Sequence, residues 1–140
     1  MKKTLNLLWL ALIFVSCAKP ISTEELLHLN GYWEISEVQT ADGDKKEFHS
    51  NNNVDFFELN DRQGTRLKVV PQLDGATRSN NIKEYFTVVD SANATYLKYK
   101  TDFAKWSEKI DKLNAEELII INANDIKYTY KRFTPIKINE

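Results

Sequence analysis

Apolar and polar residues alternate along most of the chain from residue 32 onward, and short runs rich in Asn, Asp and Gly separate the alternating segments. A period of two is typical of strands with one buried face, and Asn, Asp and Gly favour the turns between strands. The pattern predicts strands over residues 32–39, 45–49, 54–60, 65–70, 85–89, 94–103, 109–113, 117–121 and 126–133. This succession of short strands and frequent turns predicts an all-β domain, either an antiparallel barrel or a sandwich.

Three segments depart from this alternation. Residues 23–29 predict a short helical turn, with Ser22 or Thr23 as its N-cap and acidic residues in the first turn. Residues 72–83 are mostly polar and predict a long loop. In residues 103–113 the large apolar side chains lie three or four positions apart, so a helix is also arguable there.

The N-terminus has the composition of a secretory signal peptide. Two lysines precede an apolar run over residues 5–17, which is shorter than the roughly 20 apolar residues of a membrane-spanning helix. The run ends in Phe-Val-Ser-Cys at residues 14–17, which resembles the lipobox of bacterial lipoproteins. The resemblance implies a signal peptide over residues 1–16, cleavage before Cys17, and acylation of Cys17 with chains such as palmitate. An ordinary signal peptide with cleavage elsewhere is the alternative.

Cleavage before Cys17 would leave one domain. Removing residues 1–16 from the 140-residue chain leaves 124 residues and takes away two lysines, so the formal net charge moves from −1 to −3. We expect a tether over residues 17–23 and a barrel domain over residues 24–140, which is long enough for one hydrophobic core. A near-neutral domain with interspersed charges does not favour nucleic acid as a partner. Because Cys17 is the only cysteine, we expect no disulfide and no cysteine-based zinc site.

Two motifs mark the first and last predicted strands of the domain. Gly31 and Trp33 form a Gly-x-Trp motif after the helical turn, and residues 128–132 read Tyr-Thr-Tyr-Lys-Arg. These motifs resemble the opening and closing strands of lipocalins and of the lipocalin-like domains in small lipoproteins of Bacteroidota-type bacteria. The resemblance implies an up-and-down antiparallel barrel of about eight strands, in which Trp33 closes the narrow end and Arg132 packs over it. Trp33 as an ordinary core residue and Arg132 as a solvated charge are the alternatives.

The inward phase of the strands defines a candidate ligand-binding interior, because alternate residues of an up-and-down barrel point inward. Its members are aliphatic or aromatic: Ile35, Phe57, Phe86, Leu97, Tyr99, Tyr128 and Tyr130. Such a lining suits a small amphiphilic ligand. The same side chains can also fill a barrel of about eight strands, so a hollow and a filled interior are both open.

Residues that carry catalysis or bind metals are few and isolated. His28 and His49 are the only histidines, and neither has a cysteine partner nearby, so a metal site or a Ser-His-Asp triad has little to draw on. Neighbouring carboxylates at 24–25 and 116–117 point apart in a helix or a strand and do not form an acid–base pair. We therefore expect no enzymatic activity, no metal site and no cofactor.

Ser91 is a candidate modification site. Asp90-Ser91-Ala92 resembles the short pattern at which exported proteins of Bacteroidota are O-glycosylated. The motif lies at a predicted turn, where a glycan is readily accommodated.

The sequence supports two functions from different classes. In the first, a membrane-anchored lipoprotein of the cell envelope uses its barrel to bind a small amphiphilic molecule or an envelope component. In the second, a filled barrel serves as a structural or interaction subunit of an envelope complex, with an exposed apolar patch near residues 72–83 and 103–106. Ala18 follows Cys17, so the aspartate that resembles an inner-membrane retention signal is missing. The outer membrane is therefore the expected location, on either its periplasmic or its outer face.

Overall fold

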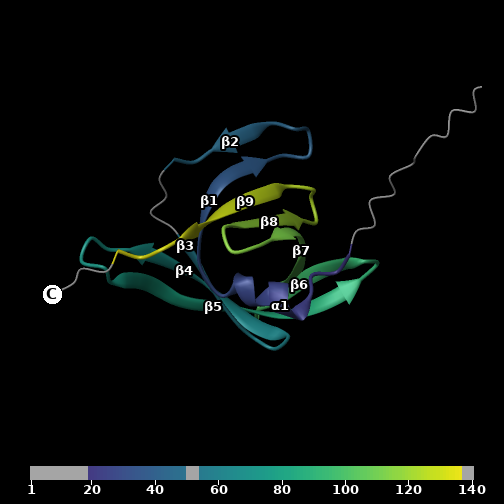
Figure 1. The fold of residues 1–140 in the computed structure, drawn as a ribbon, viewed down its shortest axis with the longest axis horizontal. Coiled ribbons are helices and arrows are strands. Elements are labelled where there is room, and N and C mark those ends of the chain that lie inside the picture. Colours follow the sequence, from purple (N-terminus) through teal and green to yellow (C-terminus); the bar gives the residue numbers. More distant parts are fainter. Residues whose placement is uncertain (1–18, 50–53, 137–140) are drawn as a thin grey trace, which may run out of the picture.

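The computed structural model describes residues 19–49 and 54–136, which form a closed antiparallel barrel (Figure 1). Its strands are β1 (Gly31–Gln39), β3 (Val54–Asn60), β4 (Gln63–Pro71), β5 (Thr77–Ser91), β6 (Ala94–Lys100), β7 (Lys105–Leu113), β8 (Glu117–Asn122) and β9 (Lys127–Phe133). Each of these eight strands pairs with the next, and β9 pairs with β1 to close the barrel. The short strand β2 (Lys45–Glu47) pairs only with the end of β1, as a hairpin arm outside the barrel wall. The prediction of an up-and-down antiparallel barrel is confirmed.

Several predicted features lie outside the described residues. These are the signal peptide over residues 1–16, the lipidation site Cys17 with Ala18, residues 50–53 of the loop before β3, and residues 137–140. No helix in the described part of the chain is long and apolar enough to cross a bilayer.

A short helical segment covers one end of the barrel, which we call the closed end. It consists of the α-helix α1 (Thr23–Leu26) and the 3₁₀ turn η1 (Leu27–Leu29). Ser22 is the N-cap: its hydroxyl accepts from the backbone N–H of Glu25, whose carboxylate accepts from the N–H of Ser22. The helical segment buries Leu26 and Leu29 in the core. The opposite end, which we call the far end, contains the turns β4–β5, β6–β7 and β8–β9.

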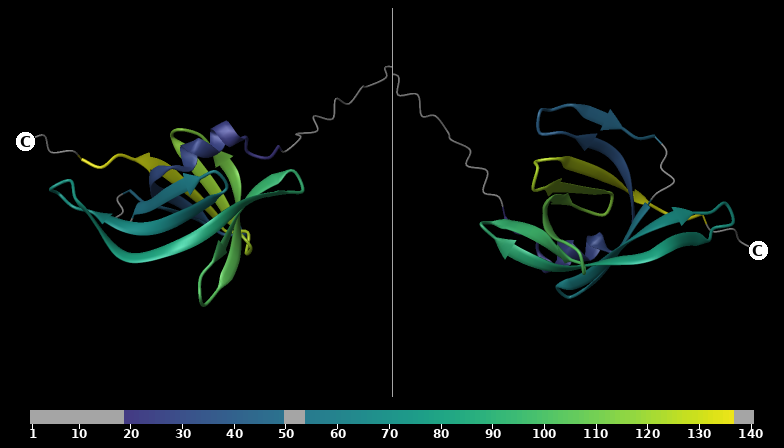
Figure 2. Two further views of the ribbon diagram at one scale, coloured as in Figure 1. Left: turned by 90° about the horizontal axis from the view of Figure 1, so that it is seen from below. Right: turned by 180° about the vertical axis from the view of Figure 1, so that it is seen from behind.

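Strand β5 corrects the prediction of a long loop over residues 72–83. Only residues 72–76 form a turn, and β5 begins at Thr77, opposite Pro71. The outer part of the β4–β5 hairpin extends beyond the barrel (Figures 1 and 2). Residues 77–83 are exposed apart from the half-buried Ser79, so neither face of this segment carries an apolar stripe. The alternation that marks a half-buried strand is therefore missing from its sequence.

Strands β6 and β7 correct two further boundaries. β6 ends at Lys100 rather than at residue 103, and β7 begins at Lys105 rather than at residue 109, with residues 101–104 forming the turn. The helix-like spacing of residues 103–113 has a different origin. A β-bulge between Ile110 and Lys112 shifts the register against β8, so Ile110 and Leu113 are both buried although they are three residues apart.

Candidate functional site

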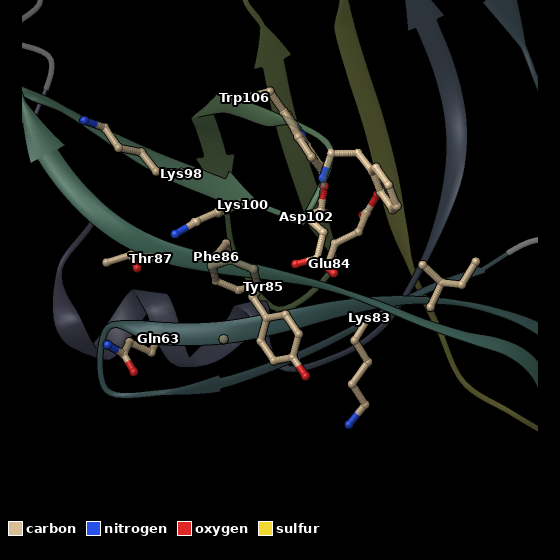
Figure 3. Close-up of a pocket in the computed structure, with 14 residues that line it drawn as sticks. Gln63, Lys83, Glu84, Tyr85, Phe86, Thr87, Lys98, Lys100, Asp102 and Trp106 are labelled. Carbon is tan, nitrogen blue, oxygen red and sulfur yellow. Dashed lines mark hydrogen bonds between the residues drawn. The ribbon is translucent and has the colours of Figure 1, made fainter.

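A cavity of about 750 Å³ opens on the β4–β7 wall of the barrel. Strands β5 and β6 are paired from the closed end as far as Tyr85 and Lys100. Between this pair and the far end, β5 has no β6 residue beside it. The cavity occupies this divergence, and its lining comes from β4, residues 82–87 of β5, the end of β6, the turn at 101–103 and the first part of β7. Lys83 and Tyr85 point to one side of β5, whereas Glu84 points to the other side (Figure 3).

The inner wall of the cavity is aromatic. The Phe86 side chain is buried against β4, where Gly64 leaves room for it: a Cβ at residue 64 would lie 2.4 Å from Phe86 Cζ. Trp106 stacks on Tyr99, with ring centroids 4.9 Å apart and planes inclined by 7°. Because Tyr99 itself is buried, it supports the Trp106 ring from one side, and Trp106 also lines the cavity.

The rim of the cavity exposes large apolar side chains. Phe103, in the β6–β7 turn, is 98% exposed, Ile82 is 65% exposed, and Tyr85 is 60% exposed. Burial of such side chains by a ligand removes apolar surface from water, at roughly 25 cal/mol per Å². The rim is therefore suited to an apolar group.

Charged side chains also line the cavity. Lys83, Lys98 and Lys100 are exposed at its edge, and Glu84 and Asp102 contribute carboxylates. Glu84 already has a partner, because its Oε2 accepts from Nε of Arg66 at 2.6 Å. Because Lys98 and Lys100 pair with Thr87 and Tyr85, whereas the buried Tyr99 pairs with Phe86, these lysines lie on the outer face of the sheet and the aromatic wall lies on its inner face.

Behind Glu84, a polar layer crosses the barrel interior. The Arg66 guanidinium bridges Glu84 and Glu108, with Nη1 to Glu108 Oε2 at 3.1 Å, and lies over the Tyr99 ring at 4.6 Å from its centroid. Burial lowers the pKa of Arg66, but Tyr99, Glu108 and other neighbours raise it more, so the net shift is upward and Arg66 stays charged. Burial raises the pKa of Glu108, and Arg66 opposes that rise.

The same layer contains a second cluster around Asp55. Tyr130 Oη donates to Asp55 Oδ2 at 3.1 Å, and Lys68 Nζ donates to Asp55 Oδ1 at 2.9 Å. Burial raises the pKa of Tyr130, and Asp55 raises it further. The buried Tyr99 hydroxyl, in contrast, makes no hydrogen bond with any described residue, although Glu108 lies beside it. A buried hydroxyl without a partner costs about 1–3 kcal/mol.

The closed end is held by Trp33 and Arg132. The Arg132 guanidinium carbon lies 3.8 Å from the Trp33 ring centroid, the arrangement that the lipocalin resemblance implies. Arg132 donates to the backbone carbonyls of Asn30 (2.7 Å), Ala115 (2.9 Å) and His28. Trp33 Nε1 donates to the Leu29 carbonyl at 2.8 Å. These contacts fasten the helical segment to β1 and β9.

Gly31 makes this packing possible. Its φ of +113° is strained for a residue with a side chain, and a Cβ there would lie 2.9 Å from Arg132 Nη1. The Gly-x-Trp motif therefore positions both members of the Trp33–Arg132 contact.

The candidate interior residues lie mostly in the packed core. Five are buried side chains, namely Phe57, Phe86, Leu97, Tyr99 and Tyr130, and Ile35 and Tyr128 pack against them half-buried. Among these seven, Phe86 lines the described cavity and the other six do not. The structure thus brings the predicted residues together as a core and places the cavity to one side of them.

Sequence reasoning missed the charged members of the interior: Asp55, Arg66, Glu84 and Glu108. A signal was available for Glu108, which stands midway between Trp106 and Ile110 and so shares their phase. Choosing apolar residues as the inward set removed it from consideration.

The other candidate residues lie at the surface. Ser91 is exposed at the end of β5, next to a turn in which Ala92 and Asn93 have φ of 50° and 60°. His28 and His49 are exposed. Within residues 19–49 and 54–136, no group of three His, Cys, Asp or Glu side chains is arranged to hold a metal ion.

Comparison with known proteins gives two similar solved structures. One is the crystal structure of a lipocalin-like protein from Bacteroides uniformis ATCC 8492, with a TM-score of 0.47 and 14% identity, covering 76% of this chain and 99% of that one. The other is an uncharacterized protein from Bacteroides eggerthii DSM 20697, with a TM-score of 0.47 and 11% identity, covering 75% of this chain and 99% of that one. No protein-family model and no curated protein matches the chain.

Proposed function

We propose that this chain is a lipoprotein of the outer membrane, anchored through Cys17, whose barrel binds a small amphiphilic molecule without catalysing a reaction on it. The observation that carries the proposal is the cavity of about 750 Å³, which is lined by the aromatic rings of Phe86, Phe103 and Trp106 and by several polar residues. Ligand sites typically combine apolar walls with a few polar groups in this way.

The cavity supports this function better than the barrel interior does. The interior between the closed end and the polar layer is packed with buried side chains, from Leu29 and Trp33 to Leu97 and Ile120. The polar layer is largely engaged with itself, since Arg66, Glu108 and Asp55 all have partners. A ligand on the β5–β7 side needs no rearrangement of that core.

The test of ligand binding is native mass spectrometry of protein purified gently from its own cell envelope. We expect a reproducible extra mass on the wild type that is lost on denaturation. A double variant, Ile82→Ser with Phe103→Ser, should lose it, because both side chains are exposed in the cavity rim. Leu73→Ser is the matched control: this side chain is 92% exposed on the same hairpin but does not line the cavity. A bare wild-type mass, or equal loss in the control, contradicts the proposal.

The anchor is tested separately by Cys17→Ala. We expect the variant to move from the membrane fraction to the soluble fraction, because stable anchoring depends on acyl chains. A variant that stays in the membrane fraction contradicts acylation at Cys17.

One observation favours an interaction subunit as a second candidate. Leu73 at the tip of the β4–β5 hairpin is almost fully exposed, and Val70 nearby is 37% exposed. A photo-crosslinking residue at position 73 should then give an adduct of defined mass in intact cells, with Lys131 on β9 as the control position. Absence of an adduct specific to position 73 argues against this candidate.

A further inference from the structure

We propose that the outer face of the β4–β7 wall is a second binding site, and that it takes an acidic oligosaccharide. The ligand class is a chain of sugar rings that carries carboxylate or sulfate groups. The site is distinct from the aromatic inner face on which the proposed function depends, so each of the two proposals can fail without the other.

The strand register places the side chains of this site on one face. Two rows of directly opposite residues cross the sheet from β4 to β7, and their members lie two positions apart on each strand, so both rows share a face. The first row is Thr65, Tyr85, Lys100 and Lys105, and the second row is Gln63, Thr87, Lys98 and Ser107. Lys83 extends this face along β5, on the same side as Tyr85 (Figure 3). The alternating residues Phe86 and Tyr99 are buried, so the two rows lie on the outside of the barrel.

The outer face is strongly basic. Within residues 19–49 and 54–136, no ion pair involves any of its four lysines, which are Lys83, Lys98, Lys100 and Lys105. Acidic side chains border the face at Glu58, which pairs with Thr65, and at Asp102 in the β6–β7 turn. Even if both carboxylates are counted, the net charge is 4 − 2 = +2. The ammonium groups are therefore available to a negatively charged ligand.

The spacing of the lysines favours a ligand with several negative groups. Lys100 lies directly opposite Lys105, an arrangement of like charges that destabilises a sheet. Lys98 lies two positions along β6 on the same face, about 7 Å from Lys100. A ligand that carries acidic groups at intervals can neutralise these charges together, whereas a single small anion neutralises one or two of them.

Tyr85 provides an aromatic surface within the basic face. Its side chain is 60% exposed, and its neighbours on this face are Lys83 and Thr87 along β5, and Thr65 and Lys100 on the adjacent strands. A tyrosine ring combines a large apolar area with a polar hydroxyl group. The ring can therefore pack against the C–H face of a sugar, while the hydroxyl bonds to the hydroxyl groups of the same ligand.

The other members of the two rows are short polar side chains: Gln63, Thr65, Thr87 and Ser107. Hydroxyl and amide groups both donate and accept hydrogen bonds, which suits a ligand rich in hydroxyl groups. Neither row contains the aliphatic side chains through which a protein surface inserts into lipid. An oligosaccharide therefore fits this face better than a membrane surface does.

Part of the cavity belongs to the same face. Its lining includes six outer-face residues, namely Gln63, Lys83, Tyr85, Thr87, Lys98 and Lys100. A hollow lined by these residues surrounds a ligand with more contacts than a flat sheet can offer.

The experiment titrates the full chain, in an uncharged detergent, with tetragalacturonate and with its fully methyl-esterified form, and follows binding by calorimetry. The two ligands share the same sugar rings and differ in their carboxylates. We expect the acid to bind about tenfold more tightly than the ester, on the scale of three partly exposed charge contacts. Tetraglutamate and tetrathymidylate, which carry similar charge on a peptide and on a nucleic acid, should both bind more weakly than tetragalacturonate.

Two variants separate the roles of charge and stacking. The triple variant Lys83→Gln, Lys98→Gln and Lys100→Gln should lose about tenfold in affinity for the acid and keep its affinity for the ester. Tyr85→Ala should lose about fivefold for both ligands, because the packing of its ring does not depend on the carboxylates.

The charge control is Lys46→Gln, Lys127→Gln and Lys131→Gln, which removes the same total charge from β2 and β9, outside this face. That control should bind tetragalacturonate as the wild type does. The double variant Ile82→Ser with Phe103→Ser should also bind it normally, which keeps this test independent of the amphiphile site.

Four outcomes would overturn the inference. If tetragalacturonate does not bind, there is no oligosaccharide site of this class. Equal affinity for the acid and the ester contradicts the acidic ligand. Tetraglutamate or tetrathymidylate binding as tightly as tetragalacturonate contradicts the sugar. An equal loss in the charge control contradicts the assignment to the outer face.

Discussion

The barrel contains two arginines that stack on aromatic rings, and they are held in opposite ways. Arg132, at the closed end, lies over Trp33 and gives its hydrogen bonds to three backbone carbonyls. Arg66, in the polar layer, lies over Tyr99 and gives its hydrogen bonds to two carboxylates. Burial lowers the pKa of Arg132, whereas the carboxylates and the Tyr99 phenol around Arg66 raise its pKa despite burial.

This difference in hydrogen-bond partners indicates that the two arginines have different roles in the barrel. The Arg132 hydrogen bonds join the helical segment, the start of β1 and the β7–β8 turn through backbone carbonyls, so this contact depends mainly on the fold and not on a carboxylate partner. The Arg66 contact depends on Glu84 and Glu108. It connects to the cavity because Glu84 both pairs with Arg66 and lines the cavity. The closed end is therefore a structural device, and the polar layer is the part of the interior that is coupled to the candidate site.

Breaking the Arg66 cluster should have the largest effect. We expect Arg66→Met to lower the free energy of unfolding by about 3 kcal/mol, because it leaves Glu108 buried without a counter-charge. Adding Glu108→Gln to this variant should recover part of the loss. Urea denaturation measures both changes.

An exposed ion pair of the same length provides the control for that variant. Lys112 Nζ and Glu117 Oε1 lie 2.6 Å apart, as Arg66 Nε and Glu84 Oε2 do, but the Lys112 side chain is 52% exposed and that of Arg66 only 10%. Lys112→Gln should cost less than about 1 kcal/mol. Similar losses in the two variants would mean that burial does not distinguish the pairs.

Removing the other arginine should cost less. We expect Arg132→Met to lower the free energy of unfolding by about 2 kcal/mol, through lost hydrogen bonds to carbonyls and lost stacking on Trp33. Arg132→Lys should restore only part of this, because an ammonium group cannot reproduce the planar fork. An unchanged midpoint of urea denaturation for Arg132→Met would show that the closed end does not need this contact.

Two tyrosines of the polar layer sharpen the comparison further. Tyr130→Phe removes a hydroxyl that donates to Asp55 and should cost about 1 kcal/mol. Tyr99→Phe removes a buried hydroxyl without a partner and should be neutral or slightly stabilising. The difference between the two variants in urea denaturation is the quantity to measure, and a larger cost for Tyr99→Phe would reverse our interpretation of the layer.

The smallest expected effect is a pH dependence from Glu108. Because burial raises its pKa above the ordinary value of 4.5, the folded protein binds this proton more tightly than the unfolded chain does. The stabilisation from the proton is complete below 4.5 and is lost as the pH rises through the raised pKa. The stability of the wild type relative to Glu108→Gln should therefore fall as the pH rises from 4.5 through the raised pKa, and then level off. A stability that instead rises as the pH increases above 4.5 would contradict a raised pKa.

Features carried by local sequence could be predicted. The N-cap at Ser22 and the turn at Gly31 depend on residues adjacent in sequence. Most strands of the barrel wall bury one face, which produces the alternation of apolar and polar residues. The exposed half of β5 could not be predicted in this way, because Thr77 to Lys83 pair with β4 outside the barrel and bury neither face.

The candidate site was harder to predict, because it depends on register between distant strands. Arg66 meets Glu84 directly across β4 and β5, but it meets Glu108, 42 positions away, only through the closure of the barrel. The cavity itself lies where β5 extends beyond the end of β6. This difference in strand length is not encoded in any short motif. The predicted patch near residues 72–83 and 103–106 did include three of the exposed apolar residues, Leu73, Ile82 and Phe103.

The attachment of the tether to the barrel bears on how the molecule would stand on a membrane. The Ile21 N–H donates to Thr95 Oγ1 at 2.8 Å, and Thr95 in turn donates to Asp90, so the chain is fastened at the closed end from residue 21 onward. Ile21 is four positions along the chain from Cys17, a reach of at most about 14 Å. An acyl anchor at Cys17 would thus hold the plugged end against the lipid headgroups and turn Phe103 and the β4–β5 hairpin away from them. A ligand of the cavity would then enter and leave from the aqueous phase, away from the leaflet that holds the anchor.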